Sequence, residues 1–117
     1  MYDELKCVIT ARLFRQDKCF GPGIAELLEG VEELKSLRAA AMRMGMAYSK
    51  AWRIMRECEE KLDIKLLCSS TGGRGGGGAE VTDEGKKLLT RFRTLEKELN
   101  KTAAALLEAW REEDASL

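Results

Sequence analysis

The sequence predicts a mainly α-helical fold with a small β component, built as one domain over residues 1–117. Charged residues make up 34% of the chain, hydrophobic residues 44%, and proline occurs once, which favours a helix-rich globular protein. Apolar side chains recur at three- and four-residue steps in several segments, which is the helical period. Two short β-favouring segments flank a glycine-rich run and predict a hairpin. A chain of this length can bury a real hydrophobic core.

The N-terminal region predicts a β-hairpin over residues 5–20. Residues 5–14 alternate loosely between polar and apolar types, and Cys19 and Phe20 are expected to return as a short second strand. A Gly-Pro-Gly run at 21–23 then breaks the strand pattern.

Three helices are predicted within residues 23–63. The apolar stripe of the first consists of Ile24, Leu27, Leu28, Val31 and Leu34. Ser36 is expected to cap the second helix, which ends at Gly45. The third helix begins near Tyr48 and ends near residue 62. Its predicted buried stripe is Ala51, Met55, Cys58 and Leu62, and its glutamates Glu57, Glu59 and Glu60 are expected on a solvated face.

Residues 64–82 predict a second hairpin around the run Ser69-Ser70-Thr71-Gly72-Gly73-Arg74-Gly75-Gly76-Gly77-Gly78-Ala79. Glycine permits almost any backbone conformation, and the guanidinium of Arg74 can contact a phosphate. Such a basic tip suits a loop that lies along a nucleic-acid backbone. A nucleotide-binding P-loop is excluded because it needs Gly-Lys-Ser/Thr at the start of a helix, whereas this run ends in Ala79-Glu80.

A long helix is predicted over residues 83–113, capped by Thr82. Its apolar residues are Leu88, Phe92, Leu95, Leu99, Leu106 and Trp110. Some 30 residues at about 1.5 Å each reach about 45 Å, more than a small domain needs to cover its core. We therefore expect Leu95, Leu99, Leu106 and Trp110 to hold two copies together as a homodimer. The alternative is a helix that folds back along its own subunit.

The net charge of zero conceals a segregated pattern. Residues 24–33 carry four glutamates and no base, whereas residues 34–56 carry six bases and no acid. A second acid-free stretch covers residues 64–79. Because nucleic-acid contacts are local, the neutral total is compatible with a nucleic-acid interface.

Composition argues against catalysis and metal binding. Histidine is absent, which removes the commonest general base and metal ligand. The four cysteines, Cys7, Cys19, Cys58 and Cys68, lack the spacing of a metal site. We therefore expect no enzyme activity, no cofactor and no metal. No window approaches the ~18 apolar residues of a membrane span, and no signal peptide is evident, so we expect a cytoplasmic protein with no membrane partner.

The order of these elements matches a winged helix-turn-helix with an N-terminal β-hairpin and a long C-terminal dimerisation helix. In that architecture the third helix enters the major groove and the hairpin, called the wing, contacts the DNA backbone or the minor groove. The sequence thus predicts double-stranded DNA as a partner. The candidate contacts are Ser36, Arg38, Tyr48, Ser49, Lys50, Trp52, Arg53 and Arg56 from the helices, and Thr71, Gly72, Gly73 and Arg74 from the wing.

Residues 23–95 resemble the DNA-binding region of ModE-type molybdate-responsive transcriptional regulators. The matching residues are Ala39-Ala40-Ala41, Met44-Gly45-Met46-Ala47-Tyr48, Ala51-Trp52 and the run from Thr71 to Ala79, followed by Thr82, Gly85 and Leu88. The resemblance implies a LysR-like winged helix-turn-helix that dimerises through helices flanking the reading head. Ala47 stands where the family usually has an N-cap serine. The family's full-length regulators continue into oxyanion-binding domains, whereas this chain ends at Leu117, so we expect this chain to bind no molybdate.

Two other functions remain open from the sequence. In the first, the winged helix is a scaffold and the long C-terminal helix binds a partner protein; salt-dependent retention on duplex DNA separates this from DNA binding. In the second, the cysteines make the chain a thiol- or metal-responsive regulator; buried, unreactive thiols would argue against it.

Overall fold

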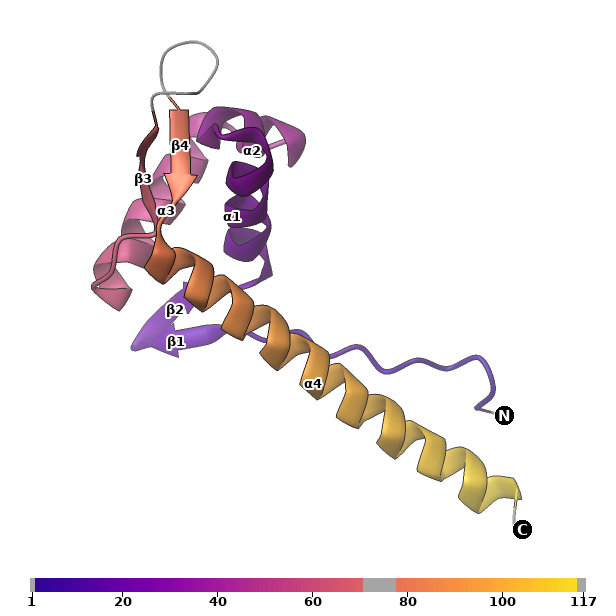
Figure 1. Cartoon of the computed structure of the whole chain (residues 1–117). Coiled ribbons are helices and arrows are strands. Elements are labelled where there is room, and N and C mark those ends of the chain that lie inside the picture. Colours follow the sequence, from indigo (N-terminus) through magenta and orange to yellow (C-terminus); the bar gives the residue numbers. More distant parts are fainter. Residues whose placement is uncertain (1, 71–77, 116–117) are drawn as a thin grey trace.

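Two strand pairs and four helices make up residues 2–70 and 78–115, the part of the chain that the computed structural model describes (Figure 1). The order is β1 (Leu13–Arg15), β2 (Asp17–Phe20), α1 (Pro22–Leu34), α2 (Leu37–Arg43), α3 (Tyr48–Leu62), β3 (Leu67–Ser70), β4 (Gly78–Val81) and α4 (Asp83–Ala115). Helices α1 to α3 and the pair β3–β4 form a head, and α4 extends away from it (Figure 1). The predicted helical fold with small antiparallel strand pairs and a long C-terminal helix is confirmed.

Helices α1 and α2 pack closely because α1 carries a glycine where they meet. A Cβ atom at Gly30 would lie 2.7 Å from the Cβ of Ala40, so a side chain there would push the helices apart. Ser36 caps α2 as predicted, since its Oγ accepts a hydrogen bond from the N–H of Ala39 at 3.0 Å. Gly45 has a φ of +67°, a conformation that favours glycine, and turns the chain from α2 into α3.

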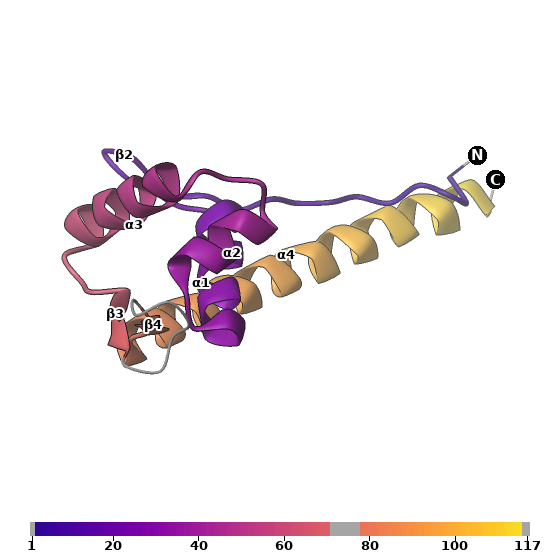
Figure 2. The same ribbon diagram turned by 90° about the horizontal axis from the view of Figure 1, so that it is seen from above.

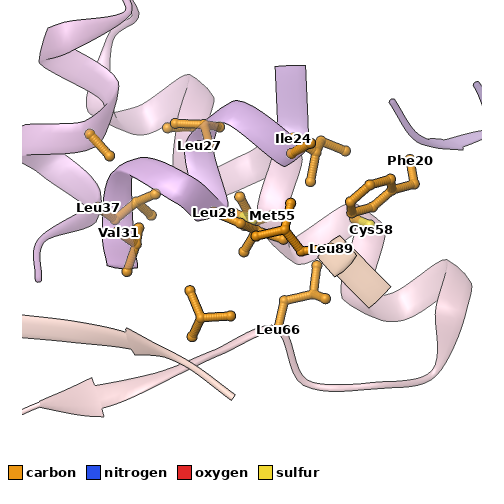
Figure 3. Close-up of a cluster of buried hydrophobic side chains, with 14 of the residues drawn as sticks. Phe20, Ile24, Leu27, Leu28, Val31, Leu37, Met55, Cys58, Leu66 and Leu89 are labelled. Atoms are coloured by element: carbon orange, nitrogen blue, oxygen red, sulfur yellow. The ribbon is translucent and has the colours of Figure 1, made fainter. Parts of the chain in front are cut away.

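The hydrophobic core lies between the head helices and the first half of α4 (Figure 3). The largest fully buried side chains are Phe20, Leu27, Leu28, Val31, Cys58, Leu66 and Phe92. The rings of Phe20 and Phe92 meet edge to face with their centroids 4.9 Å apart. This contact fixes the end of β2 against α4.

The wing is the antiparallel pair β3–β4, in which Leu67 faces Val81 and Ser70 faces Gly78. Its base is attached to the start of α4 through Thr82, whose N–H donates to the carbonyl of Leu66 at 2.9 Å. The hydroxyl of Thr82 accepts from the N–H of Gly85 at 3.0 Å, as a cap of α4. The wing therefore leaves the head at a position set by the end of α3 and the start of α4.

At position 85 only glycine fits, because the first turn of α4 packs tightly against the base of the wing. A Cβ at this position would meet the carbonyl oxygen of Leu66 at 2.8 Å and a methyl group of Val81 at 2.9 Å. The first turn of α4 therefore lies directly against the wing.

The N-terminal region differs from its prediction. Strand pairing is confined to Leu13–Arg15 and Asp17–Phe20, whereas the sequence predicts a hairpin over residues 5–20. Residues 2–12 instead run beside the C-terminal half of α4 (Figures 1 and 2). The side-chain amide of Asn100 bonds the N–H of Ile9 at 2.8 Å and its carbonyl at 3.0 Å. The side chain of Asn100 thus makes the hydrogen bonds to the backbone of Ile9 that the sequence led us to expect from a neighbouring strand.

The second attachment of this N-terminal segment is Arg111. Its guanidinium donates to the carbonyl of Tyr2 at 2.8 Å and to that of Leu5 at 2.7 Å. The ring of Tyr2 also meets Trp110 at an angle, with centroids 5.9 Å apart. The segment is therefore tied to α4 over several turns.

The buried face of α4 is offset from the predicted apolar stripe. The buried residues are Gly85, Leu89, Phe92, Ala103 and Leu107. Of the predicted stripe, Phe92 is buried, Leu88 is half-buried, and Leu95, Leu99, Leu106 and Trp110 are 40%, 38%, 63% and 53% exposed. The head and the N-terminal segment cover one side of α4 and leave most of this neighbouring side open, with Trp110 in contact with Tyr2.

Smaller differences concern helix ends. Helix α1 begins at Pro22 rather than after residue 23, because proline is readily accepted at the first helical position. Leu34 is 41% exposed at the end of α1, and Leu62 is only half-buried at the end of α3. Within residues 2–70 and 78–115, no helix combines the length and the apolar character needed to cross a membrane.

Candidate nucleic-acid interface

A groove runs between the outer face of α3 and the wing. It is lined by Ser36, Leu37, Arg38, Tyr48, Trp52, Arg56, Lys65, Leu67, Cys68, Ser69, Gly78, Ala79 and Thr82. Three bases and two aromatic residues stand among these described lining residues, and no acid does. The groove therefore combines positive charge with flat apolar rings, the chemistry that binds a nucleic acid.

Helix α3 turns one face inward and the other outward. Ala51, Met55 and Cys58 are buried against the head, as predicted. The outward residues Tyr48, Ser49, Lys50, Trp52, Arg53 and Arg56 are all exposed. All six predicted contacts on this helix are thus accessible, and three of them, Tyr48, Trp52 and Arg56, also line the groove.

Two arginines of the groove are stacked on its aromatic rings. The guanidinium carbon of Arg38 lies 4.2 Å from the ring centroid of Tyr48, and that of Arg56 lies 5.2 Å from the ring centroid of Trp52. Such stacking restricts a guanidinium while its N–H groups stay available. Trp52 is 49% exposed, so its ring keeps surface that a ligand can contact.

Ser36 lies at the edge of the groove, with its hydroxyl oxygen accepting the capping hydrogen bond from Ala39. A hydroxyl that accepts one bond can still donate its own proton, so this side chain can contact a phosphate. Lys65 lines the groove and is exposed, although the sequence did not single it out as a site residue. Its position in the acid-free stretch 64–79 was the signal for it.

Glu59 contradicts its prediction. The sequence places it on a solvated face, but its side chain is buried, with 9% exposure. One carboxylate oxygen accepts hydrogen bonds from the N–H groups of Leu66 at 2.8 Å and Leu67 at 3.2 Å. The missed signal is its spacing, because position 59 follows the buried Met55 by four residues, one helical turn.

The predicted wing contacts Thr71, Gly72, Gly73 and Arg74 lie outside the described residues. The wing strands that precede and follow them flank the groove. Their roles stay predictions.

The cysteines form two classes. Cys7 and Cys68 are exposed, Cys19 and Cys58 are buried, and all four are free thiols. Burial, with a smaller contribution from the neighbouring Cys19, raises the pKa of Cys58 to about 12. In the part of the chain that the structure describes, no three side chains of the metal-binding types are grouped to hold an ion.

The chain belongs to the bacterial regulatory helix-turn-helix proteins of the lysR family, because the model of that family matches residues 25–86, more than half of the chain. In sequence, it is similar to the molybdenum-pterin-binding protein MopB of Rhodobacter capsulatus, with 29% identity over 80% of this chain and 35% of that protein. It is 32% identical to the molybdenum transport protein ModE of Azotobacter vinelandii, over 70% of this chain and 30% of that protein.

The DNA-binding transcriptional dual regulator ModE of Escherichia coli (strain K12) is 30% identical over 76% of this chain and 34% of that protein. The matched region thus spans about a third of the length of these relatives. The predicted resemblance to the DNA-binding region of ModE-type regulators is confirmed.

Two solved structures share the fold. The BenM_DBD/benA site 1 DNA complex has a TM-score of 0.53 and 22% identity, covering 74% of this chain and 92% of that one. ArgP from Mycobacterium tuberculosis has a TM-score of 0.51 and 23% identity, covering 84% of this chain and 31% of that one. These likenesses support the winged-helix fold.

Proposed function

We propose that the chain binds double-stranded DNA sequence-specifically and regulates transcription in the cytoplasm. The observation that carries this proposal is the acid-free groove between α3 and the wing, in which Arg38, Arg56 and Lys65 surround the rings of Tyr48 and Trp52. The groove lies in the region that places the chain in a regulatory helix-turn-helix family. We assign the chain no catalytic activity, since proteins of that family are regulators.

In this proposal the first turns of α3 enter the major groove, as the third helix of a winged helix-turn-helix does. The short side chain of Ser49 allows close approach to base edges, and Arg53 has the length and donor geometry to bind guanine. Lys50, Arg38 and Arg56 contact phosphates, which position the helix without reading sequence. Arg74 and its neighbours in the wing add a further contact to the DNA backbone.

We also propose that the chain acts as a homodimer. Leu95, Leu99, Leu106 and Trp110 form an apolar stripe on α4 that stays exposed, although Trp110 also meets the ring of Tyr2. Soluble monomers rarely expose such a continuous patch, and a second copy of the same helix would cover it. A dimer also presents two α3 helices to successive turns of the duplex.

Several relatives are named for molybdenum. We propose that this chain nevertheless binds no molybdate. Selective burial of a dianion needs several donors that converge in a closed site. The bases along the α3–wing groove line an open surface instead. The two other functions are not favoured, because the matched region is the helix-turn-helix itself.

Selection of bound duplexes from random DNA tests the proposed function. A sequence-specific protein enriches one motif, with two related half-sites about one helical turn apart if it binds as a dimer. The matched control is the Arg53→Ala variant, which is expected to bind with a blurred motif. A pool that remains random after repeated rounds with the natural chain would contradict sequence-specific binding.

A further inference from the structure

Glu59 carries a charge and is buried, which costs free energy because the carboxylate loses its hydration. Among the described residues it is the only charged one that is buried, and it sits in the second half of α3. A buried carboxylate is tolerated when strong hydrogen bonds compensate for its lost hydration. The contacts of Glu59 therefore indicate which groups its charge stabilises.

The first contact is with the wing. Oε2 accepts hydrogen bonds from the N–H groups of Leu66 at 2.8 Å and Leu67 at 3.2 Å, where the chain enters β3. The carbonyl of Leu66 in turn accepts from the N–H of Thr82 at 2.9 Å, where the second strand of the wing ends at the same base. A single carboxylate thus fixes the base of the wing to α3.

The second contact is with the groove. Oε1 of Glu59 lies 3.9 Å from Nη1 of Arg56, whose guanidinium is stacked on Trp52. Arg56 and Trp52 both line the groove, whereas Glu59 does not. One oxygen of this carboxylate therefore bonds the wing, and the other lies at ion-pair distance from the α3 wall of the same groove.

We propose that Glu59 is a positioning residue, which sets the distance between the wing and α3 and orients Arg56, and that DNA binding depends on it although it touches no DNA. The proposal rests on the DNA-binding function proposed above. The proposal and a pure charge effect predict opposite changes in DNA affinity when Glu59 is substituted. Removal of an acid beside a DNA-binding groove should tighten binding if charge alone mattered, whereas loss of a positioning contact should weaken it.

Two substitutions separate charge from position. Glu59→Gln removes the charge but keeps an oxygen that can accept from Leu66 or Leu67, so the fold should survive. Glu59→Asp keeps the charge but shortens the side chain by one methylene, which draws the carboxylate away from both N–H groups. The matched control is Glu60→Gln, which removes the same charge from the exposed neighbouring residue.

The measurements are affinity for the selected duplex and amide hydrogen exchange of the DNA-free chain. We expect both Glu59 variants to bind more weakly. Glu59→Asp should lose at least about tenfold, because it gives up hydrogen bonds to a charged group, and Glu59→Gln should lose less, because its neutral oxygen keeps weaker bonds. The amides of Leu66 and Leu67 should exchange faster in both variants. Glu60→Gln should bind equally or more tightly, with unchanged exchange.

Three results would overturn the proposal. Unchanged DNA binding by Glu59→Asp would show that the position of the carboxylate does not matter, and tighter binding by Glu59→Gln would show that its charge outweighs any positioning role. Unchanged exchange of Leu66 and Leu67 in Glu59→Asp would show that the carboxylate does not hold the wing. If the natural chain binds no duplex at any salt concentration, the DNA-binding function fails instead, and the exchange rates still decide whether Glu59 fixes the wing to α3.

Discussion

Arg93 of α4 is joined to Glu29 of α1 by two parallel hydrogen bonds. Nε donates to Oε2 at 3.1 Å and Nη2 donates to Oε1 at 2.6 Å, while Nη1 reaches Glu96 one turn along α4 at 2.6 Å. The hydrogen bonds to Glu29 raise the pKa of Arg93 above its usual value. This planar pair connects the long helix to the reading head and fixes the direction in which α4 leaves it.

The first prediction concerns Arg93→Gln. Both side chains of the pair are more than a third exposed, so its loss should lower the free energy of unfolding by only about 1 kcal/mol or less. The larger effect should fall on DNA binding, because a freer α4 no longer fixes the separation of the two α3 helices in a dimer. We expect the variant to tolerate duplexes whose half-sites are moved apart by one or two base pairs.

Arg91→Gln is the control for this experiment, because Arg91 is exposed on the same helix and its substitution changes the charge equally. Affinity should be measured for both variants on a series of duplexes that differ only in spacer length. Identical spacer preferences in Arg93→Gln and the natural chain would contradict the assigned role of the Arg93–Glu29 pair.

The second prediction concerns salt. If a dimer makes about eight phosphate contacts, the logarithm of its DNA affinity should fall with the logarithm of the salt concentration at a slope near −7. Anisotropy titrations of a labelled duplex between low and physiological salt measure this slope. A flat dependence would mean that the basic side of α3 does not face the DNA backbone.

The third prediction separates two arginines. Arg74→Ala should weaken binding to all duplexes about equally, because a wing contact to the backbone carries no sequence information. Arg53→Ala should also reduce the preference for the selected motif, by ~1–3 kcal/mol for each lost base contact. Affinities of both variants for the selected duplex and for random DNA provide the comparison. Equal losses on the two DNAs in both variants would refute this division of roles.

The fourth prediction concerns the buried thiol of Cys58. Burial raises its pKa from the ordinary 9.0 to about 12, so near pH 8 its thiolate is about a thousandfold rarer than that of an ordinary cysteine. Iodoacetamide should therefore label the exposed Cys7 and Cys68 rapidly and leave Cys58 unmodified. Peptide mass spectrometry measures this, and the unfolded chain, in which all four cysteines should react, is the control.

The same pKa shift gives a pH dependence of stability. In the unfolded chain the thiol ionises near pH 9.0, whereas in the fold it stays protonated up to about 12. The contribution of Cys58 to stability is therefore complete below pH 9 and is lost as the pH rises through about 12. Rapid labelling of Cys58 in the folded chain would contradict both statements.

Local patterns in the sequence predicted most of the head. The helical periods of α1 and α3 identified Leu27, Val31 and Met55 as core, because burial of one face needs apolar residues at that spacing. The cap at Ser36 also follows a local rule, since its partner lies three residues away. Where a contact lies within one turn, as at this cap, the sequence alone was sufficient.

The failures involve partners that are distant in the sequence or polar. The pairing of Ile9 with Asn100 joins positions 91 residues apart, and no local pattern reveals that a helix side chain replaces a β-strand. Glu59 follows the buried Met55 by one helical turn, as a core residue would, but its carboxylate is typical of the surface. Its burial depends on two N–H groups of β3 that become available only when the wing folds against α3.

The last prediction is the homodimer itself. Burial of a large aliphatic or aromatic side chain contributes ~1.5–3 kcal/mol, and two-fold symmetry counts each residue of the α4 stripe twice. Glutamate at Leu99 and Leu106 would place charges in that interface, so the double variant should sediment as a monomer and lose DNA affinity. The control variant carries glutamate at Thr94 and Ala105, which are exposed on another face of α4. This variant should remain a dimer. The N-terminal segment meets the stripe at Trp110, through the ring of Tyr2, whereas its hydrogen bonds to Asn100 and Arg111 lie on the neighbouring face. A natural chain that sediments as a monomer at micromolar concentration would show that α4 carries no interface between copies.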